Sequence, residues 1–183
     1  MKKTILLDMD GVIMDWNSQV LKELGLDKDQ KIRQRMFNGE NLEDIVEDFD
    51  SKMDFRNESF WSEIKPFFWA QDLYSSLEKE GKIYVLTSPG KFSKRGANFL
   101  KASISGKLTT LEKYFPQARP IFGNEKYLCA NKNSILIDDH IGKIKPFYEK
   151  GGNTFLWPHE YRVQEIGYEV VKKRCLDTIR SMN

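Results

Sequence analysis

Residues 5–16, ILLDMDGVIMDW, run from a short apolar segment directly into two carboxylates, Asp8 and Asp10, with Gly11 immediately after them. The apolar residues are typical of a buried β-strand. Two acidic side chains separated by one residue repel each other at neutral pH unless a cation lies between them. The stretch therefore predicts a strand whose carboxyl end carries a cation-binding site.

Further short apolar runs predict more buried strands. With the first, the expected strands are Thr4–Leu7, Ile83–Leu86, Pro120–Phe122, Ile135–Ile137 and Thr154–Trp157. Near-continuous apolar strands are typical of a parallel sheet covered on both faces. Helical spacing of apolar residues predicts helices at Ala70–Lys79, Ser93–Lys101 and about His159–Ile179. The alternation of strand and helix predicts an α/β fold with a doubly wound parallel sheet.

Residues 17–69 differ from the rest of the chain because they contain no clear strand, many charges and several short helical patterns. They follow the first strand directly. We expect a small helical cap inserted there, with residues 1–16 and 70–183 forming the core domain.

The composition excludes several classes of protein. The 183 residues are 40% hydrophobic and 31% charged, and 29 basic residues nearly balance 27 acidic ones, which is typical of a globular protein. The net charge of +2 is too small to indicate a surface for long nucleic acids. We interpret the basic residues near the C-terminus as a solvated helix face. No apolar stretch approaches the about 18 residues of a membrane span. Two cysteines without metal-ligand spacing predict reduced intracellular thiols. Asp8 ends the N-terminal apolar run too early for a secretion signal, so we expect a cytoplasmic protein.

Polar side chains follow three of the predicted strands where ligands bind in open α/β sheets, at the carboxyl ends. They are Asp8 and Asp10 after the first strand, Thr87 and Ser88 after the second, and Asp138, Asp139 and His140 after a later one. Carboxylate and hydroxyl oxygens suit Mg²⁺ better than Zn²⁺, and Mg²⁺ commonly bridges to a substrate phosphate. The sequence predicts a metal-assisted phosphoryl-transfer site.

These residues carry a resemblance to a known family. DMDGV at 8–12, LTSPG at 86–90, a following lysine and ILIDD at 135–139 resemble, in order, the four motifs of the haloacid dehalogenase-like phosphatases. The resemblance implies that Asp8 is the nucleophile and that Asp10 is the general acid and base. It also implies that Mg²⁺ is held by Asp8, by the backbone carbonyl of Asp10 and by Asp138.

The resemblance implies supporting roles for other residues. Thr87 and Ser88 would bind phosphoryl oxygens, and either Lys94 or Lys126, the better match to the third motif, would offset charge in the transition state. Asp139 would act behind the metal ligands or through a metal-bound water. For His140 and His159 we expect structural or surface roles, because the implied chemistry already has its acid and base.

Finer features indicate the substrate. LDMDGV followed by Asp15 and Trp16, the small helical insertion, and TSP in the second motif are most similar to the 5'(3')-deoxyribonucleotidases. That resemblance implies a deoxyribonucleoside monophosphate as substrate, with Phe60 or Trp61 contacting the base. The alternative for these aromatic residues is the core of the insertion itself.

Other functions stay open at this point. The same chemistry could act on a sugar phosphate, on another small phosphate monoester or on a nucleic-acid 3'-phosphate. A non-catalytic binding protein on the same scaffold would have to lack the nucleophile or the acid, yet both Asp8 and Asp10 are present. A phosphomutase is disfavoured, because it would need a cap that shuts out water.

Overall fold

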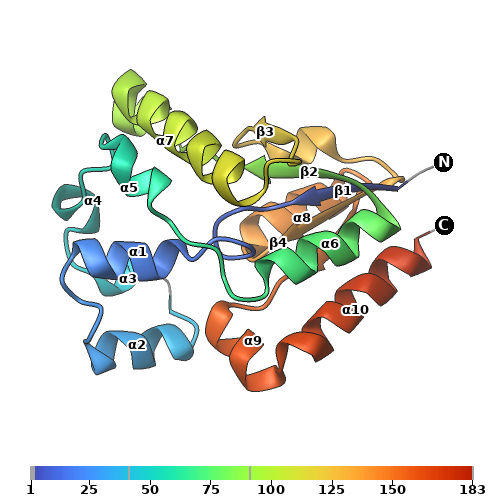
Figure 1. The fold of residues 1–183 in the computed structure, drawn as a ribbon, viewed down its shortest axis with the longest axis horizontal. Helices are drawn as coiled ribbons and strands as arrows, with labels where there is room; N and C mark the ends of the chain where they lie inside the picture. Colours follow the sequence, from blue (N-terminus) through green and yellow to red (C-terminus); the bar gives the residue numbers. More distant parts are fainter. Residues whose placement is uncertain (1–2, 41, 91, 183) are drawn as a thin grey trace.

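The computed structural model describes residues 3–40, 42–90 and 92–182, without the side chains of residues 50 and 92–95. Its elements in chain order are β1 (Lys3–Leu7), α1 (Trp16–Glu23), α2 (Gln30–Phe37), α3 (Leu42–Ile45), α4 (Phe49–Lys52), α5 (Glu58–Ser62), α6 (Ala70–Glu80), β2 (Gly81–Thr87), α7 (Phe92–Tyr114), β3 (Pro120–Phe122), the 3₁₀ turn η1 (Lys126–Cys129), β4 (Ser134–Asp138), α8 (Ile141–Glu149), β5 (Asn153–Leu156), α9 (Glu160–Ile166) and α10 (Tyr168–Ser181) (Figure 1).

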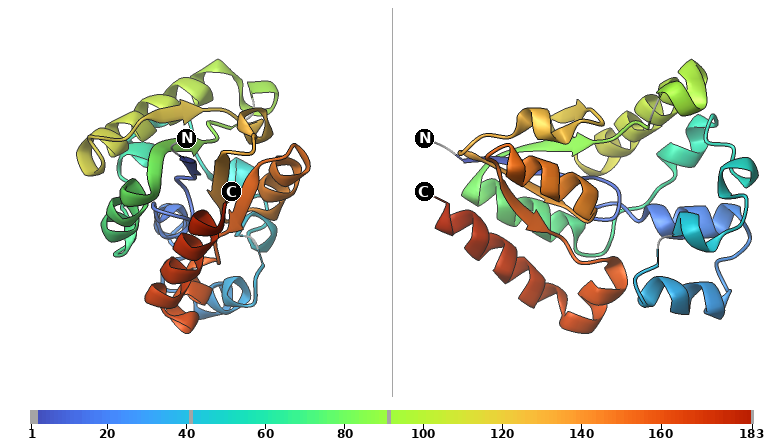
Figure 2. Two further views of the ribbon diagram at one scale, coloured as in Figure 1. Left: turned by 90° about the vertical axis from the view of Figure 1, so that its right-hand side faces the viewer. Right: turned by 180° about the vertical axis from the view of Figure 1, so that it is seen from behind.

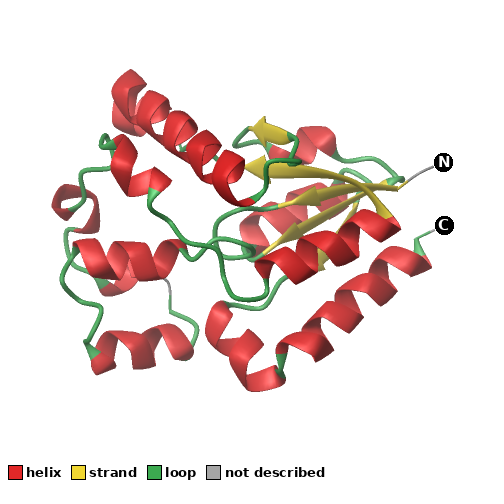
Figure 3. Cartoon of the chain, in the orientation of Figure 1, coloured by secondary structure: helices red, strands yellow, loops and turns green. Residues whose placement is uncertain are grey.

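The strands form one five-stranded sheet in the order β3-β2-β1-β4-β5, with every neighbouring pair parallel (Figure 3). The central strand is β1, where Ile5 pairs with Ile83 of β2 on one side and with Ile135 of β4 on the other. This confirms the predicted α/β fold. It also places the loops after β2, β1 and β4 next to one another at the carboxyl edge.

Both faces of the sheet are covered, as the apolar strands predict. Ile5 and Ile135 pack in one core with residues of α6 and α10, whereas Leu6 and Leu136 pack on the opposite face with Phe147 of α8. Figure 2 shows α8 on the opposite side of the sheet from α6 and α10. Burial on both faces makes β1 a rigid support for the residues that follow it.

Two predicted helices differ from the structure. Helix α7 continues far beyond Lys101, to Tyr114, and contains a break at Gly96, where φ is 77°. The C-terminal stretch forms two helices instead of one, because Gly167 between them adopts a φ of 93°. Positive φ is a conformation that glycine adopts readily and that interrupts a right-handed helix.

The segment α1–α5 follows β1 and precedes α6 along the chain, and it lies beyond the carboxyl edge of the sheet (Figure 1). The outgoing and returning chains run side by side: the amide of Asp15 donates to the carbonyl of Lys65 over 2.8 Å, and the amide of Phe67 donates to that of Ile13 over 3.1 Å. Paired connections of this kind hold α1–α5 close to the end of β1. Across the described residues, no helix combines the length and apolar character needed to cross a membrane.

A buried acid lies where α9 meets α1. The side chain of Glu160 is almost fully buried, and burial together with the charge of Asp15 raises the pKa of its carboxyl to about 8. Hydrogen bonds to Tyr161 and Asn17 and the charge of Arg33 act in the opposite direction but are outweighed. We therefore expect Glu160 to be protonated in the folded protein at neutral pH.

This protonation makes stability depend on pH. Between the ordinary pKa of 4.5 and about 8, the unfolded chain releases the Glu160 proton while the folded chain keeps it, so stability falls as pH rises through this window. We predict that Glu160→Gln, which cannot titrate, melts at a higher temperature than the wild type at pH 8 and that the difference shrinks towards pH 5. Thermal melts over this range test it, with the exposed Glu165→Gln of the same helix as control. A difference that does not change with pH would contradict the assignment.

Candidate active site

The first catalytic candidate, Asp8, is held by the end of β1. Its amide donates to the carbonyl of Ile137 in β4 over 2.9 Å, and its Oδ1 accepts from the amide of Met9 over 2.8 Å. Gly11 follows with a φ of 79°, and a Cβ at this position would lie 2.0 Å from Oδ2 of Asp139. Glycine is therefore required both for the turn and for the close approach of the loops after β1 and β4.

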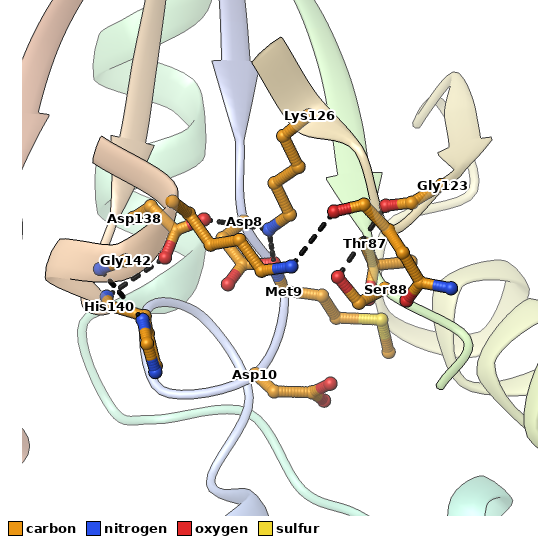
Figure 4. Close-up of polar contacts among 12 residues, drawn as sticks. Asp8, Met9, Asp10, Thr87, Ser88, Gly123, Lys126, Asp138, His140 and Gly142 are labelled. Atoms are coloured by element: carbon orange, nitrogen blue, oxygen red, sulfur yellow. Dashed lines mark hydrogen bonds and ion pairs between the residues drawn. The ribbon is translucent and has the colours of Figure 1, made fainter. Parts of the chain in front are cut away.

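Lys126 enters the same place from η1. Its Nζ lies 2.6 Å from Oδ1 of Asp8 and 2.7 Å from Oδ2 of Asp138, and its side chain is only 2% exposed (Figure 4). The other oxygen of Asp138, Oδ1, accepts from the amide of His140 over 2.9 Å. Of the two lysines predicted to face the phosphate, the structure brings Lys126 to Asp8. The side chain of Lys94 lies outside the described residues.

The carboxylates of Asp8, Asp138 and Asp139 each offer an oxygen within 4.8 Å of the others. Facing these three acidic groups, Lys126 supplies one positive charge, so the ionised forms of all three would carry more negative charge than it offsets. A divalent cation would neutralise them, and oxygen ligands suit Mg²⁺. Asp139, expected behind the metal ligands, is thus placed as a candidate ligand itself.

The acidity of these groups reflects the same crowding. Burial and the charge of Asp8 raise the pKa of Asp138 to about 6, and burial with the charges of Asp8 and Asp138 raises the pKa of Asp139 well above its ordinary value. Burial acts to lower the pKa of Lys126, but the two adjacent carboxylates outweigh it and the pKa is raised. Lys126 is therefore charged, and the site favours a further cation.

The loop after β2 contributes hydroxyl and carbonyl groups. Thr87 is fully buried, and its Oγ1 accepts a hydrogen bond from Nζ of Lys107 over 2.9 Å. The same Nζ donates to the carbonyl of Ser88 over 2.9 Å, and it lies 2.5 Å from Oδ2 of Asp10. Lys107 thereby connects the loops after β1 and β2.

The carboxylates of Asp8 and Asp10 form ion pairs with different lysines. The two carboxylates point in different directions in Figure 4, with Lys126 beside Asp8, and Lys107 forms the ion pair with Asp10. The repulsion between two neighbouring carboxylates is relieved by one ammonium for each. The carboxylate of Asp10 accordingly lies outside the acidic cluster, and a role in metal binding would fall to its backbone carbonyl.

The aromatic candidates lie in a packed cluster. Phe60 and Trp61 of α5 are 4% and 5% exposed, and both rings pack against Phe55. This burial favours the alternative that they form the core of the α1–α5 segment. Trp61 nevertheless reaches the edge of the site, since Nζ of Lys107 lies 5.2 Å from the centre of its ring.

Two histidines have structural contacts. His140 precedes α8 as its N-cap, where Nδ1 accepts from the amide of Gly142 over 2.9 Å (Figure 4). Nε2 of His159 lies 3.2 Å from the side-chain nitrogen of Asn17. Neither contact involves the acidic cluster, in keeping with the structural roles expected for both.

Lys107 is the residue that sequence reasoning missed. It lies in the part of α7 beyond the predicted end at Lys101, so no element placed it near a strand exit. The sequence offers only a weak signal, a single lysine between Gly106 and Leu108. Its partners Asp10 and Thr87 are 97 and 20 residues away in the chain, which is a relation that only the fold reveals.

Comparisons with known proteins bear on the fold and on the class of protein. A "Putative 5'(3')-deoxyribonucleotidase" of Staphylococcus aureus is 24% identical over 152 residues, which cover 80% of this chain and 78% of the relative. A hydrolase structure from Streptococcus pneumoniae TIGR4 superposes with a TM-score of 0.52 at 14% identity, covering 91% of this chain and 98% of that one. A haloacid dehalogenase-like family hydrolase from Streptococcus pneumoniae gives a TM-score of 0.50 at 15% identity and covers 91% of each chain. No family model matches the sequence.

The fold is that of the haloacid dehalogenase-like hydrolases, and the sequence relative together with this fold supports a phosphatase of that kind. The oxygen ligands around Asp8 are compatible with magnesium as its cofactor.

The negative charge of the acidic cluster leads to a prediction about the effect of Mg²⁺ on stability. We predict that MgCl₂ at about 100 times its Kd stabilises the wild type by about 2.7 kcal/mol, which raises the melting temperature by about 5–10 °C. Asp139→Asn should melt higher than the wild type without metal, because a repulsive charge is gone, and should gain less from Mg²⁺. Thermal melts with EDTA and with MgCl₂ measure both effects, and the exposed Asp177→Asn is the control. An Mg²⁺ response of Asp139→Asn equal to that of the wild type would exclude Asp139 as a ligand.

Proposed function

We propose that this protein is a magnesium-dependent phosphomonoesterase that hydrolyses deoxyribonucleoside monophosphates through a phosphorylated Asp8. The observation that carries the proposal is the convergence of Asp8, Lys126 and Asp138, with Thr87 and Asp10 on the adjoining loops. A nucleophile, a charge-neutralising cation, metal ligands and an acid are the parts that phosphoryl transfer requires.

The reaction follows from the positions of these groups. Oδ1 of Asp8 is held by the Met9 amide and by Lys126, which leaves Oδ2 to attack the phosphorus. As the bond from Asp8 to phosphorus forms, the ester bond breaks and Asp10 gives its proton to the leaving oxygen. Water then attacks the phosphorus of the phosphorylated Asp8 and passes a proton back to Asp10, and the bond between phosphorus and Asp8 breaks, which releases phosphate and restores the Asp8 carboxylate. Bound Mg²⁺ would neutralise phosphoryl charge and would be held by Asp8, Asp138 and Asp139.

The phosphoryl oxygens need donors as well. Thr87, whose Oγ1 accepts from Lys107, has its hydroxyl hydrogen available for a phosphoryl oxygen. Ser88 is half-buried on the same loop, and its hydroxyl lies 3.5 Å from the carbonyl of Gly123. We place both in the phosphate-binding loop, with Lys126 offsetting charge in the transition state.

The substrate class rests on the deoxyribonucleotidase-like relative and on the features shared with that family, Asp15, Trp16 and TSP at 87–89. We further infer that residues 17–69 act as a cap over the site, because α1–α5 lie beyond the carboxyl edge of the sheet. The free cysteines Cys129 and Cys175 are compatible with work in the cytoplasm.

Substrate class and chemistry are tested together by phosphate release. We predict turnover of dUMP or dTMP in MgCl₂ with higher kcat/KM than of their ribose counterparts or of sugar phosphates, and loss of turnover in EDTA. Asp8→Asn should lower kcat by about 10³-fold or more, because the nucleophile is gone. Rapid acid quenching of the wild type should leave one phosphoryl group on the peptide that contains Asp8.

The outcomes separate the parts of the proposal. The exposed Asp177→Asn should retain full activity. Preference for a sugar phosphate or a 3'-phosphate would overturn the substrate and keep the chemistry. No turnover of any monoester with magnesium would overturn the phosphatase itself.

A further inference from the structure

Lys107 is a buried lysine in the middle of α7, with its side chain 1% exposed. Burying an ammonium is costly unless its charge is paired and its hydrogens are bonded. Nζ meets both conditions, because its partners are Oδ2 of Asp10, Oγ1 of Thr87 and the carbonyl of Ser88. These three acceptors match the three hydrogens of an ammonium group. The lysine is thus fully committed to two loops of the candidate site.

The position of Lys107 is fixed from the side of α5. A Cβ on Gly106 would lie 2.4 Å from Cβ of Trp61, so glycine permits α5 and α7 to touch. One turn further, the hydroxyl of Thr110 donates to the carbonyl of Trp61 over 2.9 Å. The ring of Trp61 lies beside the ammonium of Lys107. This packing leaves the lysine little freedom to choose other partners.

We propose that Lys107 is a positioning residue that sets the orientation of Asp10 and of the Thr87 hydroxyl for phosphoryl transfer. The proposal rests on the function proposed above. It assigns to α7 a role in the reaction that neither the motifs nor the comparisons contain.

Lys107 orients the hydroxyl of Thr87. An ammonium group donates hydrogen bonds and cannot accept one, so Oγ1 of Thr87 must be the acceptor in this pair. The hydroxyl hydrogen of Thr87 is therefore directed elsewhere, and a phosphoryl oxygen is an acceptor of the right kind. Without Lys107 the hydroxyl could turn and donate to a neighbouring carbonyl instead.

Lys107 also orients the carboxylate of Asp10. Lys107 holds Oδ2, while Oδ1 is buried and has no hydrogen-bond partner among the described residues. The lysine is thus the hydrogen-bond partner that orients this carboxylate. In the acid form, Oδ2 accepts from Lys107, so the proton resides on Oδ1 and is committed to no other acceptor. From there it passes to the leaving oxygen as the bond between phosphorus and that oxygen breaks.

This division of roles predicts an effect that depends on the leaving group. An alkyl phosphate such as dTMP leaves as a strongly basic alkoxide and needs the proton of Asp10, whereas p-nitrophenyl phosphate leaves as a stable phenolate and does not. The parameter kcat/KM reports the steps up to departure of the leaving group. A lysine that only supports the fold would affect both esters by the same factor.

The test is Lys107→Met, which keeps the length of the side chain and removes the donors. We expect kcat/KM for dTMP to fall by about 10²-fold or more, and at least about ten times further than kcat/KM for p-nitrophenyl phosphate. Lys107→Arg, which keeps the charge, should recover part of the loss for dTMP. Lys101→Met, an exposed lysine of the same helix, should match the wild type on both esters.

Several outcomes would decide against the role. Equal losses on the two esters, or no loss on either, would overturn it while the phosphatase assignment stands. A wild type that hydrolyses neither ester in MgCl₂ would overturn the proposed function first. Circular dichroism and thermal melting confirm that the variants fold. If Lys107→Met does not fold, the same comparison is made with Lys107→Gln, with the same expected and contradicting ratios.

Discussion

The structure depends on one electrostatic constraint, the confinement of three carboxylates around a single buried ammonium. Asp8, Asp138 and Asp139 come from two adjacent strand ends, and Lys126 reaches them from a third segment. Burying these negative charges away from water and close to one another would oppose folding. The parallel sheet holds them together, and the ion pairs of Lys126 with Asp8 and Asp138 offset part of their charge. The fold therefore carries an unfavourable cluster of acidic groups, which we propose binds a divalent cation and the phosphate of the substrate.

The backbone makes that confinement possible. With β1 in the centre of the sheet, its carboxyl end lies between those of β2 and β4, so three loops meet without long excursions. Gly11 then lets the loop after β1 turn within contact of Asp139, where any side chain would collide with the carboxylate. The position after the two acids therefore requires glycine. Glycine allows the loop that follows Asp8 to lie in contact with Asp139.

Features that depend on residues close together in the chain could be predicted from the sequence, and features that depend on distant residues could not. Strands and their polar ends are local patterns, so the sheet and the positions of Asp8, Thr87 and Asp138 at its edge could be predicted. The length of α7 could not, because residues 102–114 mix small, polar and apolar side chains and are held by packing against α5. Long-range burial also decides the aromatic residues: Phe60 and Trp61 resemble surfaces for a base in the sequence, but both are buried, and Trp61 packs on Phe99 of the distant helix α7. Such partners are chosen by tertiary contacts, which no window of sequence contains.

Asp8 and Asp10, two carboxylates separated only by Met9, are each paired with a lysine of their own. A single cation between Asp8 and Asp10 would hold both acids in one role. Instead, Lys126 belongs to Asp8 and the acidic cluster, while Lys107 belongs to Asp10 and the hydroxyl of Thr87. The separation is chemically useful, because a nucleophile must stay ionised beside the metal, whereas an acid must be able to gain and lose a proton in a different electrostatic environment. Pairing each carboxylate with its own ammonium gives two acids, two residues apart, the different surroundings that their proposed tasks require.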